Sequence, residues 1–265
     1  MSQKPPPKQF VKTPINGTKF VVLVSSAKGG VGKSTVAINL AFALQNLGFK
    51  IGILDADVYG PSLPKLLDLN DKPKSEDGKS MIPLEKYDAQ CMSMGFLVDE
   101  NTPMIWRGPM VISALKTMTQ KVLWKNRDII IVDMPPGTGD TQLTFAQEVK
   151  VDGAIIVSTP QDLALLDVKR GIQMFDKTGV KILGLIDNMS YFKGDDNKKY
   201  KIFGESGVEE TAKKFNKEFL GHLPIHQNLR TSADKGNPLT HSEPEHEVSK
   251  LFLDIAKKIK MSLEK

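Results

Sequence analysis

The sequence is poor in cysteine and has no long apolar run. Its 265 residues include a single cysteine, Cys91, so no disulfide can form within the chain, as is typical of a reducing compartment. Residues 1–10 are polar and proline-rich and lack the apolar segment of a secretory signal. No apolar stretch approaches the length of a membrane span. We therefore expect a soluble, cytoplasmic protein; a processed organellar form is also compatible with these features.

Charge of one sign is only slightly in excess. Lysine and arginine number 36 against 31 acidic residues, which gives a formal net charge of +5 at pH 7. The lysines are scattered along the chain, as expected for a solvated surface. This balance suits anionic ligands but does not indicate a nucleic-acid partner. With 40% hydrophobic residues, the chain is long enough for one large α/β core.

The segment 20–47 combines a strand, a glycine-rich turn and a helix. Residues 20–24 are an apolar, β-branched run typical of a buried strand, and helical spacing of apolar residues then begins at Val36. The helical positions are Val36, Leu40, Ala43, Leu44 and Leu47. The turn supplies the candidate nucleotide-binding residues Lys28, Gly29, Gly30, Val31, Gly32, Lys33, Ser34 and Thr35. Strand, glycine loop, Gly-Lys-Ser and helix are the parts of a P-loop.

The chemistry of this turn favours a polyphosphate. Glycines allow backbone N–H groups to surround an anion, and the N-terminus of a helix adds a partial positive charge. Lys33 would reach the β- and γ-phosphates, and the Ser34 hydroxyl would ligate Mg²⁺. The sequence therefore predicts that ATP and Mg²⁺ bind here.

Two further predicted strands end in acidic residues. The strand over 50–54 is followed by Asp55 and Asp57, and the strand over 128–133 ends on Asp133. Ligands of open α/β sheets bind at such carboxyl ends. One acid of the first pair would support Mg²⁺ or Lys33 while the other faces the attacking water. Taken alone, that pair would equally suit a turn or a helix cap.

Asp133 fits the Walker B pattern, in which the acid at the end of an apolar strand holds the Mg²⁺ shell. Residues 135–140, Pro-Pro-Gly-Thr-Gly-Asp, follow it. This stiff loop with glycine hinges is suited to sensing a γ-phosphate.

The remaining pattern alternates strands with helices. Strands are predicted over 91–97, 154–158 and 181–188, helices over 163–177 and 248–259, and an exposed loop over 70–80. Residues 105–111 are predicted to lead into a further helix that runs through about Gln120, with Pro109 in its first turn. Cys91 is expected to be a small apolar residue of a half-buried strand rather than a nucleophile. The fold class is α/β, a three-layer P-loop NTPase with a mostly parallel central sheet and helices on both faces. Residues 1–18 are predicted to be a disordered or extended lead-in, and residues 19–265 the ATPase domain.

Five motifs resemble the Mrp/ApbC family of P-loop ATPases. They are Ser25-Ser-Ala-Lys-Gly-Gly-Val-Gly-Lys-Ser-Thr35, Leu54-Asp-Ala-Asp-Val-Tyr-Gly-Pro-Ser62, Trp106-Arg-Gly-Pro-Met110, Val132-Asp-Met-Pro-Pro-Gly-Thr-Gly-Asp140 and Asn188-Met-Ser-Tyr-Phe192. The first also resembles the deviant Walker A of the related MinD and ParA ATPases. The resemblance implies ATP hydrolysis, a nucleotide-dependent homodimer, and a role in iron–sulfur cluster assembly or delivery. The implied partners are an iron–sulfur scaffold or apoprotein clients.

The resemblance also implies roles for single residues. Lys28 would reach across the dimer to the partner's nucleotide, and Asp57 would position the attacking water. Asp133 would hold Mg²⁺ through water. Asn188 would read the adenine, helped by the turn that contains Pro224.

One departure from the family pattern concerns the cluster ligands. Members that bridge an iron–sulfur cluster carry Cys-x-x-Cys shortly after Asn-Met-Ser-Tyr-Phe, but residues 193–201 contain no cysteine. Clusters need soft thiolate ligands, and Asp195 and Asp196 offer hard oxygen atoms instead. His222 and His226 are separated by a proline turn and do not resemble a metal pair. The sequence therefore predicts no iron–sulfur ligands of its own.

The alternative function is a MinD/ParA-like regulatory ATPase switch that controls partner or membrane binding. The predicted C-terminal helix over 248–259 is basic and amphipathic, and such a helix can lie on a membrane. We expect instead that its apolar face packs on the domain. A small-molecule kinase, a third class with a P-loop, is disfavoured by Lys28 and by the Trp106-Arg-Gly-Pro segment.

Overall fold

The computed structural model describes residues 12–97, 108–205 and 207–265. Eight strands form one sheet in the order β10-β7-β6-β1-β5-β2-β4-β3, and every neighbouring pair is parallel except β3 with β4. The strands are β1 Thr18–Ser25, β2 Ile51–Asp55, β3 Leu84–Lys86, β4 Ala89–Ser93, β5 Arg127–Asp133, β6 Gly153–Ser158, β7 Ile182–Asp187 and β10 Phe219–His222. The predicted mostly parallel sheet is confirmed.

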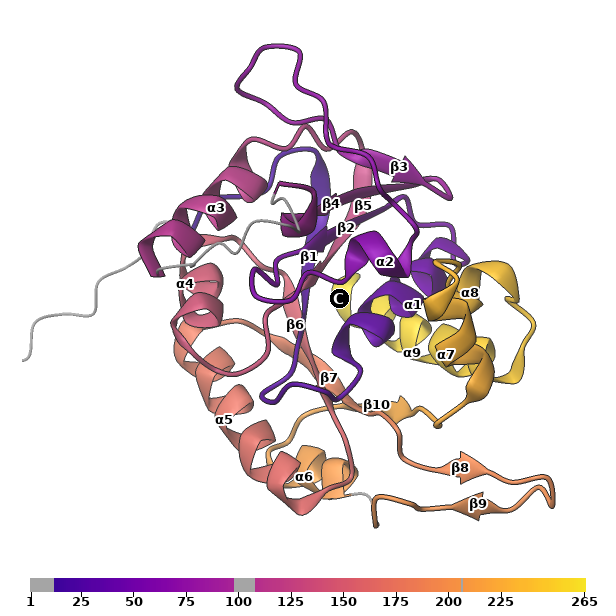
Figure 1. The fold of residues 1–265 in the computed structure, drawn as a ribbon. Coiled ribbons are helices and arrows are strands. Elements are labelled where there is room, and N and C mark those ends of the chain that lie inside the picture. The colour runs from indigo at the N-terminus through magenta and orange to yellow at the C-terminus, as the bar shows by residue number, and fades with distance from the viewer. Residues whose placement is uncertain (1–11, 98–107, 206) are drawn as a thin grey trace, which may run out of the picture.

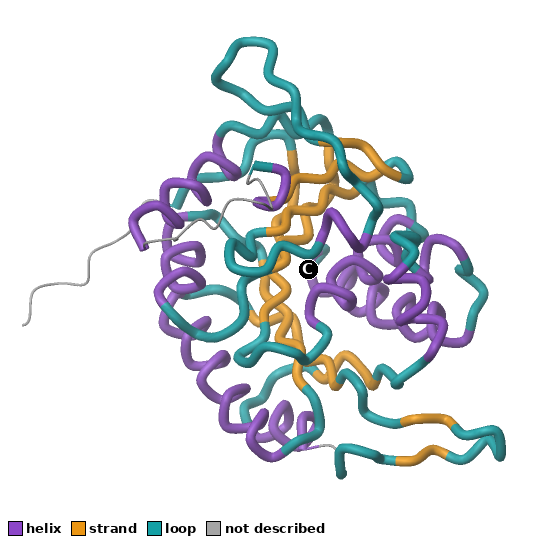
Figure 2. Tube along the Cα trace, in the orientation of Figure 1, coloured by secondary structure: helices purple, strands orange, loops and turns teal. Residues whose placement is uncertain are grey.

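Helices cover both faces of this sheet, as Figures 1 and 2 show. On one face lie α3 Gly108–Gln120, α4 Asp140–Glu148, α5 Asp162–Thr178 and α6 Gly207–Lys214. On the other lie α1 Lys33–Gln45, α2 Leu63–Leu66, α7 Gln227–Asp234, α8 Leu239–Ser242 and α9 Glu247–Leu263. The short 3₁₀ helix η1 spans Met94–Phe96. This is the expected three-layer arrangement.

The sheet topology brings the predicted site strands together. β1, which enters the glycine-rich turn, lies between β5 and β6, and β5 lies between β1 and β2. Asp55 at the end of β2 is in register with Asp133 at the end of β5. The glycine turn and both acids therefore meet at the carboxyl edge of three strands, where open α/β sheets bind ligands.

Helix α1 is buried on nearly all sides, because it lies between the sheet and helices α8 and α9. A helix that is apolar all round is typical of such an interior position. It begins at Lys33, earlier than the apolar spacing alone indicated, and ends at Gln45. Leu47 was expected on its apolar face but lies beyond the helix end, where Gly48 takes a φ of 90°.

The C-terminal helix α9 packs on the domain, as expected. It contacts α1, and its side chains Val248, Phe252, Ile255 and Ile259 are buried in the core. Full burial of one such side chain contributes roughly 1.5–3 kcal/mol to stability. The apolar face of this helix is therefore occupied within the protein.

One predicted strand has other bounds than expected. The strand expected over 91–97 spans Ala89–Ser93 and is buried rather than half-buried, because it lies inside the sheet between β2 and β3. Within the segment predicted as a lead-in, Thr13 exchanges backbone hydrogen bonds with Glu148 and Lys150, and Ile15 is buried. Thr13 and Ile15 thus contact the body of the protein.

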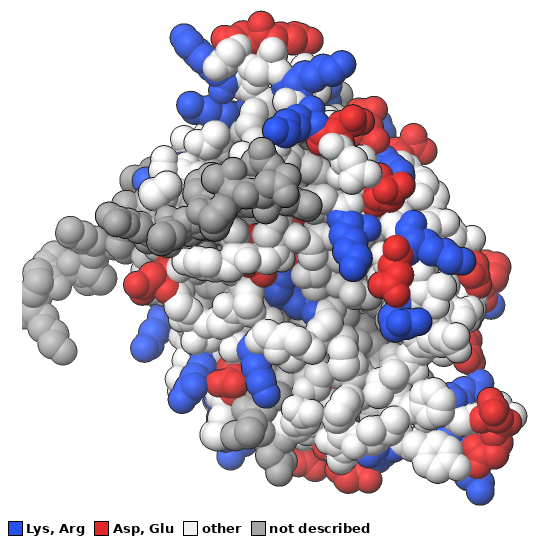
Figure 3. All heavy atoms as spheres, in the orientation of Figure 1, with Lys and Arg blue, Asp and Glu red and all other residues white. Residues whose placement is uncertain are grey.

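The remaining features are local. Trp106 and Arg107, which carry part of the family resemblance, lie outside the described residues. A separate antiparallel hairpin, β8 Phe192–Lys193 and β9 Lys199–Tyr200, projects from the body. Within the described ranges, no helix has the length and apolar character needed to cross a bilayer. Acidic and basic side chains are interspersed over the visible face (Figure 3).

Candidate functional site

The glycine-rich turn leads from β1 into α1 with two glycines in left-handed conformation. Gly30 has a φ of 79° and Gly32, the N-cap of α1, a φ of 76°. A Cβ atom at Gly32 would lie 2.5 Å from the Asn188 side chain, so this position excludes larger residues. The turn exposes Gly29 and Gly30 while it buries Val31. This is the backbone form that directs N–H groups into an anion site.

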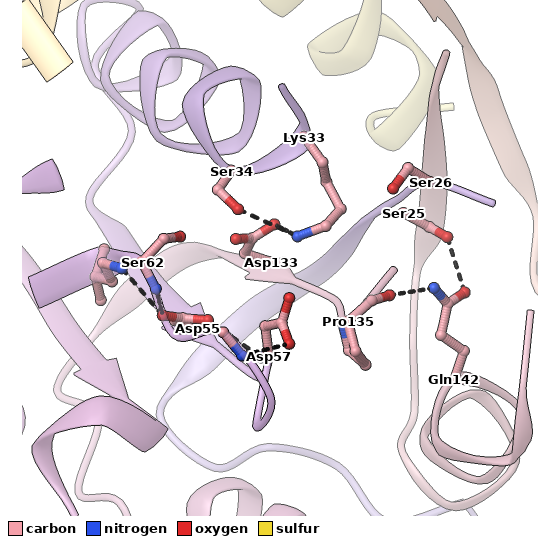
Figure 4. A network of polar contacts seen from close by, with 12 residues as sticks. Ser25, Ser26, Lys33, Ser34, Asp55, Asp57, Ser62, Asp133, Pro135 and Gln142 are labelled. Atoms are coloured by element: carbon pink, nitrogen blue, oxygen red, sulfur yellow. Dashed lines mark hydrogen bonds and ion pairs between the residues drawn. The ribbon is translucent and has the colours of Figure 1, made fainter. Parts of the chain in front are cut away.

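Lys33 forms the centre of the site. Its ammonium group makes an ion pair with a carboxylate oxygen of Asp133 and lies 3.2 Å from the Ser34 hydroxyl oxygen (Figure 4). The side chains of Lys33 and Asp133 are 6% and 3% exposed, so this is a buried ion pair. Burial raises the pKa of Asp133, while the charge and hydrogen bond of Lys33 act to lower it.

The Asp55 carboxylate accepts hydrogen bonds from the loop that follows β2. One carboxylate oxygen accepts the N–H of Ser62 at 2.9 Å, the N–H of Leu63 at 3.0 Å and the hydroxyl of Ser93 at 2.9 Å. The other accepts the N–H of Asp57 at 3.1 Å. Burial raises the pKa of Asp55 to about 7, with the nearby charge of Asp133 next in effect. With four donors satisfied, this carboxylate shapes the path of the chain around Asp57.

Asp57 and Pro136 border a cavity at the turn. Its volume is about 160 Å³, and its lining is Ser26, Gly29, Gly30, Gly32, Lys33, Ser34, Thr35, Asp57 and Pro136. Asp57 is 8% exposed and accepts the N–H groups of Tyr59 and Gly60 at 3.2 Å each. Lys28 is exposed and is not part of this lining. Two larger cavities lie elsewhere on the described residues, but neither is lined by Lys33, Ser34 or the glycine turn.

Asn188 lies directly behind the turn. Its amide nitrogen donates to the carbonyl oxygen of Val31 at 2.8 Å, which leaves its carbonyl oxygen as a free acceptor. Within the described residues that buried oxygen has no hydrogen-bond partner. The neighbouring turn is held against it, because the backbone of Leu223 bonds to Asp187 and Ser190. Pro224 is buried in that turn. An orphaned acceptor here fits an exocyclic amino group such as that of adenine.

The structure therefore brings together most of the residues predicted for the site, namely Gly29 to Thr35, Asp55, Asp57 and Asp133, with Asn188 bonded to the turn at Val31. Pro224 is not part of the cavity lining and lies buried in the turn beside Asn188. Sequence reasoning missed Ser25, Ser93 and Gln142. Ser93 holds Asp55, and Gln142 on α4 bonds both Ser25 and the carbonyl of Pro135. Ser25 stands in the first motif without an assigned role, and no motif includes Ser93 or Gln142, because the contacts Ser25–Gln142 and Asp55–Ser93 join residues distant in sequence.

The donor set fits a magnesium ion. The Ser34 hydroxyl and the Asp133 carboxylate lie together beside Lys33, and a P-loop Mg²⁺ takes its other ligands from water and phosphate oxygens. Throughout residues 12–97, 108–205 and 207–265 no group of three or more His, Cys, Asp or Glu side chains is arranged to hold a metal. Cys91 is fully buried in β4, and burial raises the pKa of its thiol far above the usual range.

Comparisons with known proteins show which proteins this chain resembles. Residues 17–260 match the model of a ParA family described as NUBPL iron-transfer P-loop NTPase. The chain is 49% identical to the iron–sulfur cluster transfer protein NUBPL of Dictyostelium discoideum, covering 97% of this chain and 80% of that protein. It is 47% identical to the iron–sulfur cluster carrier protein of Escherichia coli K12, covering 94% and 68% respectively. The nucleotide-binding protein of Archaeoglobus fulgidus, solved with ADP, superposes with a TM-score of 0.76 at 35% identity, covering 89% of this chain and 92% of that one.

Proposed function

Since this chain belongs to the family of NUBPL-type iron-transfer P-loop NTPases, we propose that it binds and hydrolyses ATP to drive iron–sulfur cluster transfer. ATP and Mg²⁺ bind at the glycine turn, and hydrolysis is coupled to nucleotide-dependent homodimer formation. The clients are apoproteins that receive the cluster, or a scaffold that supplies it. We expect it to work in the cytoplasm, with a processed organellar form as the alternative.

One observation carries the nucleotide assignment: Lys33, Ser34 and Asp133 converge beside the glycine turn at the carboxyl edge of the sheet. When a nucleotide enters, the Lys33 ammonium exchanges its bond with Asp133 for the β- and γ-phosphates. Asp133 would then hold a water of the Mg²⁺ shell, and the Ser34 hydroxyl would ligate the ion. Bound there, Mg²⁺ would supply neutralisation of the charge that develops on the phosphates.

Asp57 is the residue we assign to the attacking water. It is the acid that lines the cavity, and the four donors on Asp55 keep the chain around it in place. Asp55 thus acts first as an anchor of the Asp57 loop, and a contact to Mg²⁺ through water is secondary. Lys28, exposed at the rim, supplies a positive charge to the nucleotide of the second subunit.

Adenine recognition is assigned to Asn188. The unpartnered carbonyl oxygen accepts a hydrogen bond from the adenine amino group, and Pro224 presents an apolar surface to the ring. A base without an amino group at that place would leave the buried oxygen unpaired, which favours ATP over GTP.

The iron–sulfur cluster must be held by ligands other than the Cys-x-x-Cys pair of the family, because this chain lacks that pair. The hairpin β8–β9 occupies the place of the family's cysteine pair, and its residues 192–200 contain no cysteine. The one thiol, Cys91, is buried in the sheet. We propose that the cluster is held by a partner's thiolates and that this protein provides the nucleotide-driven step.

The alternative, a membrane-binding switch of the MinD type, is not favoured by the structure. The C-terminal helix that would contact a membrane buries its apolar side chains against α1.

Isothermal titration and an ATPase assay test the proposal. Lys33→Ala should weaken ATP binding by roughly 10–100-fold or more, because a charged partner of the phosphates is lost. The matched control is Lys19→Ala, since Lys19 is an exposed lysine that pairs with Asp128 on the same sheet. Equal ATP affinity in Lys33→Ala and the wild type would overturn the site assignment, and a wild type without ATPase activity would overturn the hydrolytic function.

A further inference from the structure

The side-chain amide of Gln142 joins two segments that border the nucleotide cavity. Gln142 lies in the first turn of α4 and is 2% exposed. Its carbonyl oxygen accepts the Ser25 hydroxyl at 2.9 Å, and its amide nitrogen donates to the carbonyl oxygen of Pro135 (Figure 4). Both ends of a buried amide are therefore engaged.

The first of these segments leads into the glycine turn. Ser25 is the last residue of β1, and Ser26 beside it lines the cavity. The Ser26 hydroxyl donates to the carbonyl oxygen of Lys28 at 2.8 Å, so this short stretch also fixes the start of the turn. A shift of Ser25 would be passed to Ser26 and to the backbone of Lys28, which precede the residues Gly32 to Thr35 assigned to phosphate binding.

The second segment is the loop from Pro135 to Gly139 that follows β5. Pro136 lines the cavity, and the N–H of Gly137 donates to the carbonyl oxygen of Ser26 at 2.9 Å. Gly137 has a φ of 100°, a backbone conformation that favours glycine. Because glycine is flexible, contacts with neighbouring residues must fix the position of this loop. The loop is thus attached to the glycine turn by one backbone bond and by the Gln142 bridge.

We propose that Gln142 is a positioning residue for ATP hydrolysis, which holds the Pro135–Gly139 loop against the entry to the glycine turn. This inference rests on the function proposed above. Two groups of residues among the lining of the cavity have different assigned roles. Gly32 to Thr35, at the start of α1, are assigned to phosphate, and no hydrogen bond joins them to Gln142. Asp57 is assigned to the attacking water, and Pro136 of the bridged loop lines the same cavity. Loss of the bridge should therefore affect turnover and spare nucleotide affinity.

Three variants separate this role from a general loss of structure. Gln142→Ala removes the bridge and leaves the Ser25 hydroxyl buried without its acceptor. Ser25→Ala removes only one of the two bonds, and it remains informative if Gln142→Ala fails to fold. Gln147→Ala is the matched control, because Gln147 lies on the same helix and is partly exposed.

The experiment measures kcat and KM for ATP, the ADP dissociation constant and the melting temperature of each variant. For Gln142→Ala we expect kcat to fall by roughly tenfold or more, with ADP affinity within about twofold of the wild type. Ser25→Ala should show a smaller fall in kcat of the same kind, and Gln147→Ala should match the wild type. In the double variant the two effects should be less than additive, since both act on one bridge.

Two results would overturn the inference while leaving the ATPase function intact. One is that Gln142→Ala folds and has the same kcat as an active wild type. If Gln142→Ala does not fold, the same result for Ser25→Ala counts instead. The other is a loss of ADP affinity equal to the loss of kcat, which would show that the residue only supports the fold of the site. A wild type that binds ATP but does not hydrolyse it would refute the proposed function itself, and the positioning role with it.

Discussion

The ion pair between Lys33 and Asp133 should make the folding stability of the nucleotide-free protein depend on Lys33, the residue that we assign to phosphate binding. The perturbation is Lys33→Met, which keeps most of the side-chain volume and removes the charge. Both partners are almost fully buried, at 6% and 3% exposure. The change would leave the Asp133 carboxylate in the interior without its cation.

The expected magnitude follows from the cost of an uncompensated buried charge. Removing one partner of a buried ion pair destabilises a protein by roughly 3–5 kcal/mol. For a chain of this size, roughly 3 kcal/mol corresponds to a fall in melting temperature of about 6–12 °C. Adding Asp133→Asn to Lys33→Met removes the stranded charge, so the double variant should recover most of that loss.

The effect should depend on pH in one direction. Burial raises the pKa of Asp133, and without Lys33 the main influence that lowers it is gone. An aspartate in the unfolded chain ionises near pH 4, so above that value the folded variant binds a proton that the unfolded chain has released. Its stability therefore falls as pH rises towards the folded pKa, and the penalty of Lys33→Met should be larger at pH 8 than at pH 5.

Thermal and urea unfolding without nucleotide, followed by circular dichroism at both pH values, are the assays. Lys19→Met serves as the control, since Lys19 pairs with Asp128 at 3.0 Å but is 73% exposed, and such surface pairs contribute at most about 1 kcal/mol. The reasoning is refuted if Lys33→Met is as stable as the control at pH 8. It is also refuted if the double variant is no more stable than the single one.

Four further predictions concern the site, the buried thiol and cluster binding. Lys28→Ala should keep ATP binding but lose hydrolysis and nucleotide-dependent dimerisation, as light scattering with a slowly hydrolysed ATP analogue would show; normal dimers would contradict the trans role. Asp57→Asn should lower kcat much more than ATP affinity, and an equal loss of affinity measured by titration would make Asp57 a binding residue. The buried thiol of Cys91 should react with a disulfide reagent only after unfolding, and anaerobic reconstitution of the protein alone with iron and sulfide should leave no cluster spectrum after desalting; a stable cluster would show that the chain holds iron through ligands other than cysteine pairs.

The sequence alone determined the local parts of this protein. A glycine turn between an apolar strand and a helix, and acids at the ends of apolar runs, are set by residues close together in the chain. Such patterns identified the parallel sheet, the glycine turn and the acids Asp55, Asp57 and Asp133. They also predicted that α9 would be amphipathic, because helical spacing is a local property.

Tertiary structure decided which of these parts touch, because the strand order 6-1-5-2 is not the chain order. Lys33 and Asp133 are 100 residues apart in sequence, and Ser25 and Gln142 are 117 apart. Their contacts follow from strands that lie side by side only in the folded sheet. Likewise, the folded structure buries the carbonyl oxygen of Asn188 without a partner within the described residues, and it packs α9 against α1. Local spacing predicted that α9 would pack on the domain, but which element covers it, and which buried atom is left without a partner, results from the whole fold.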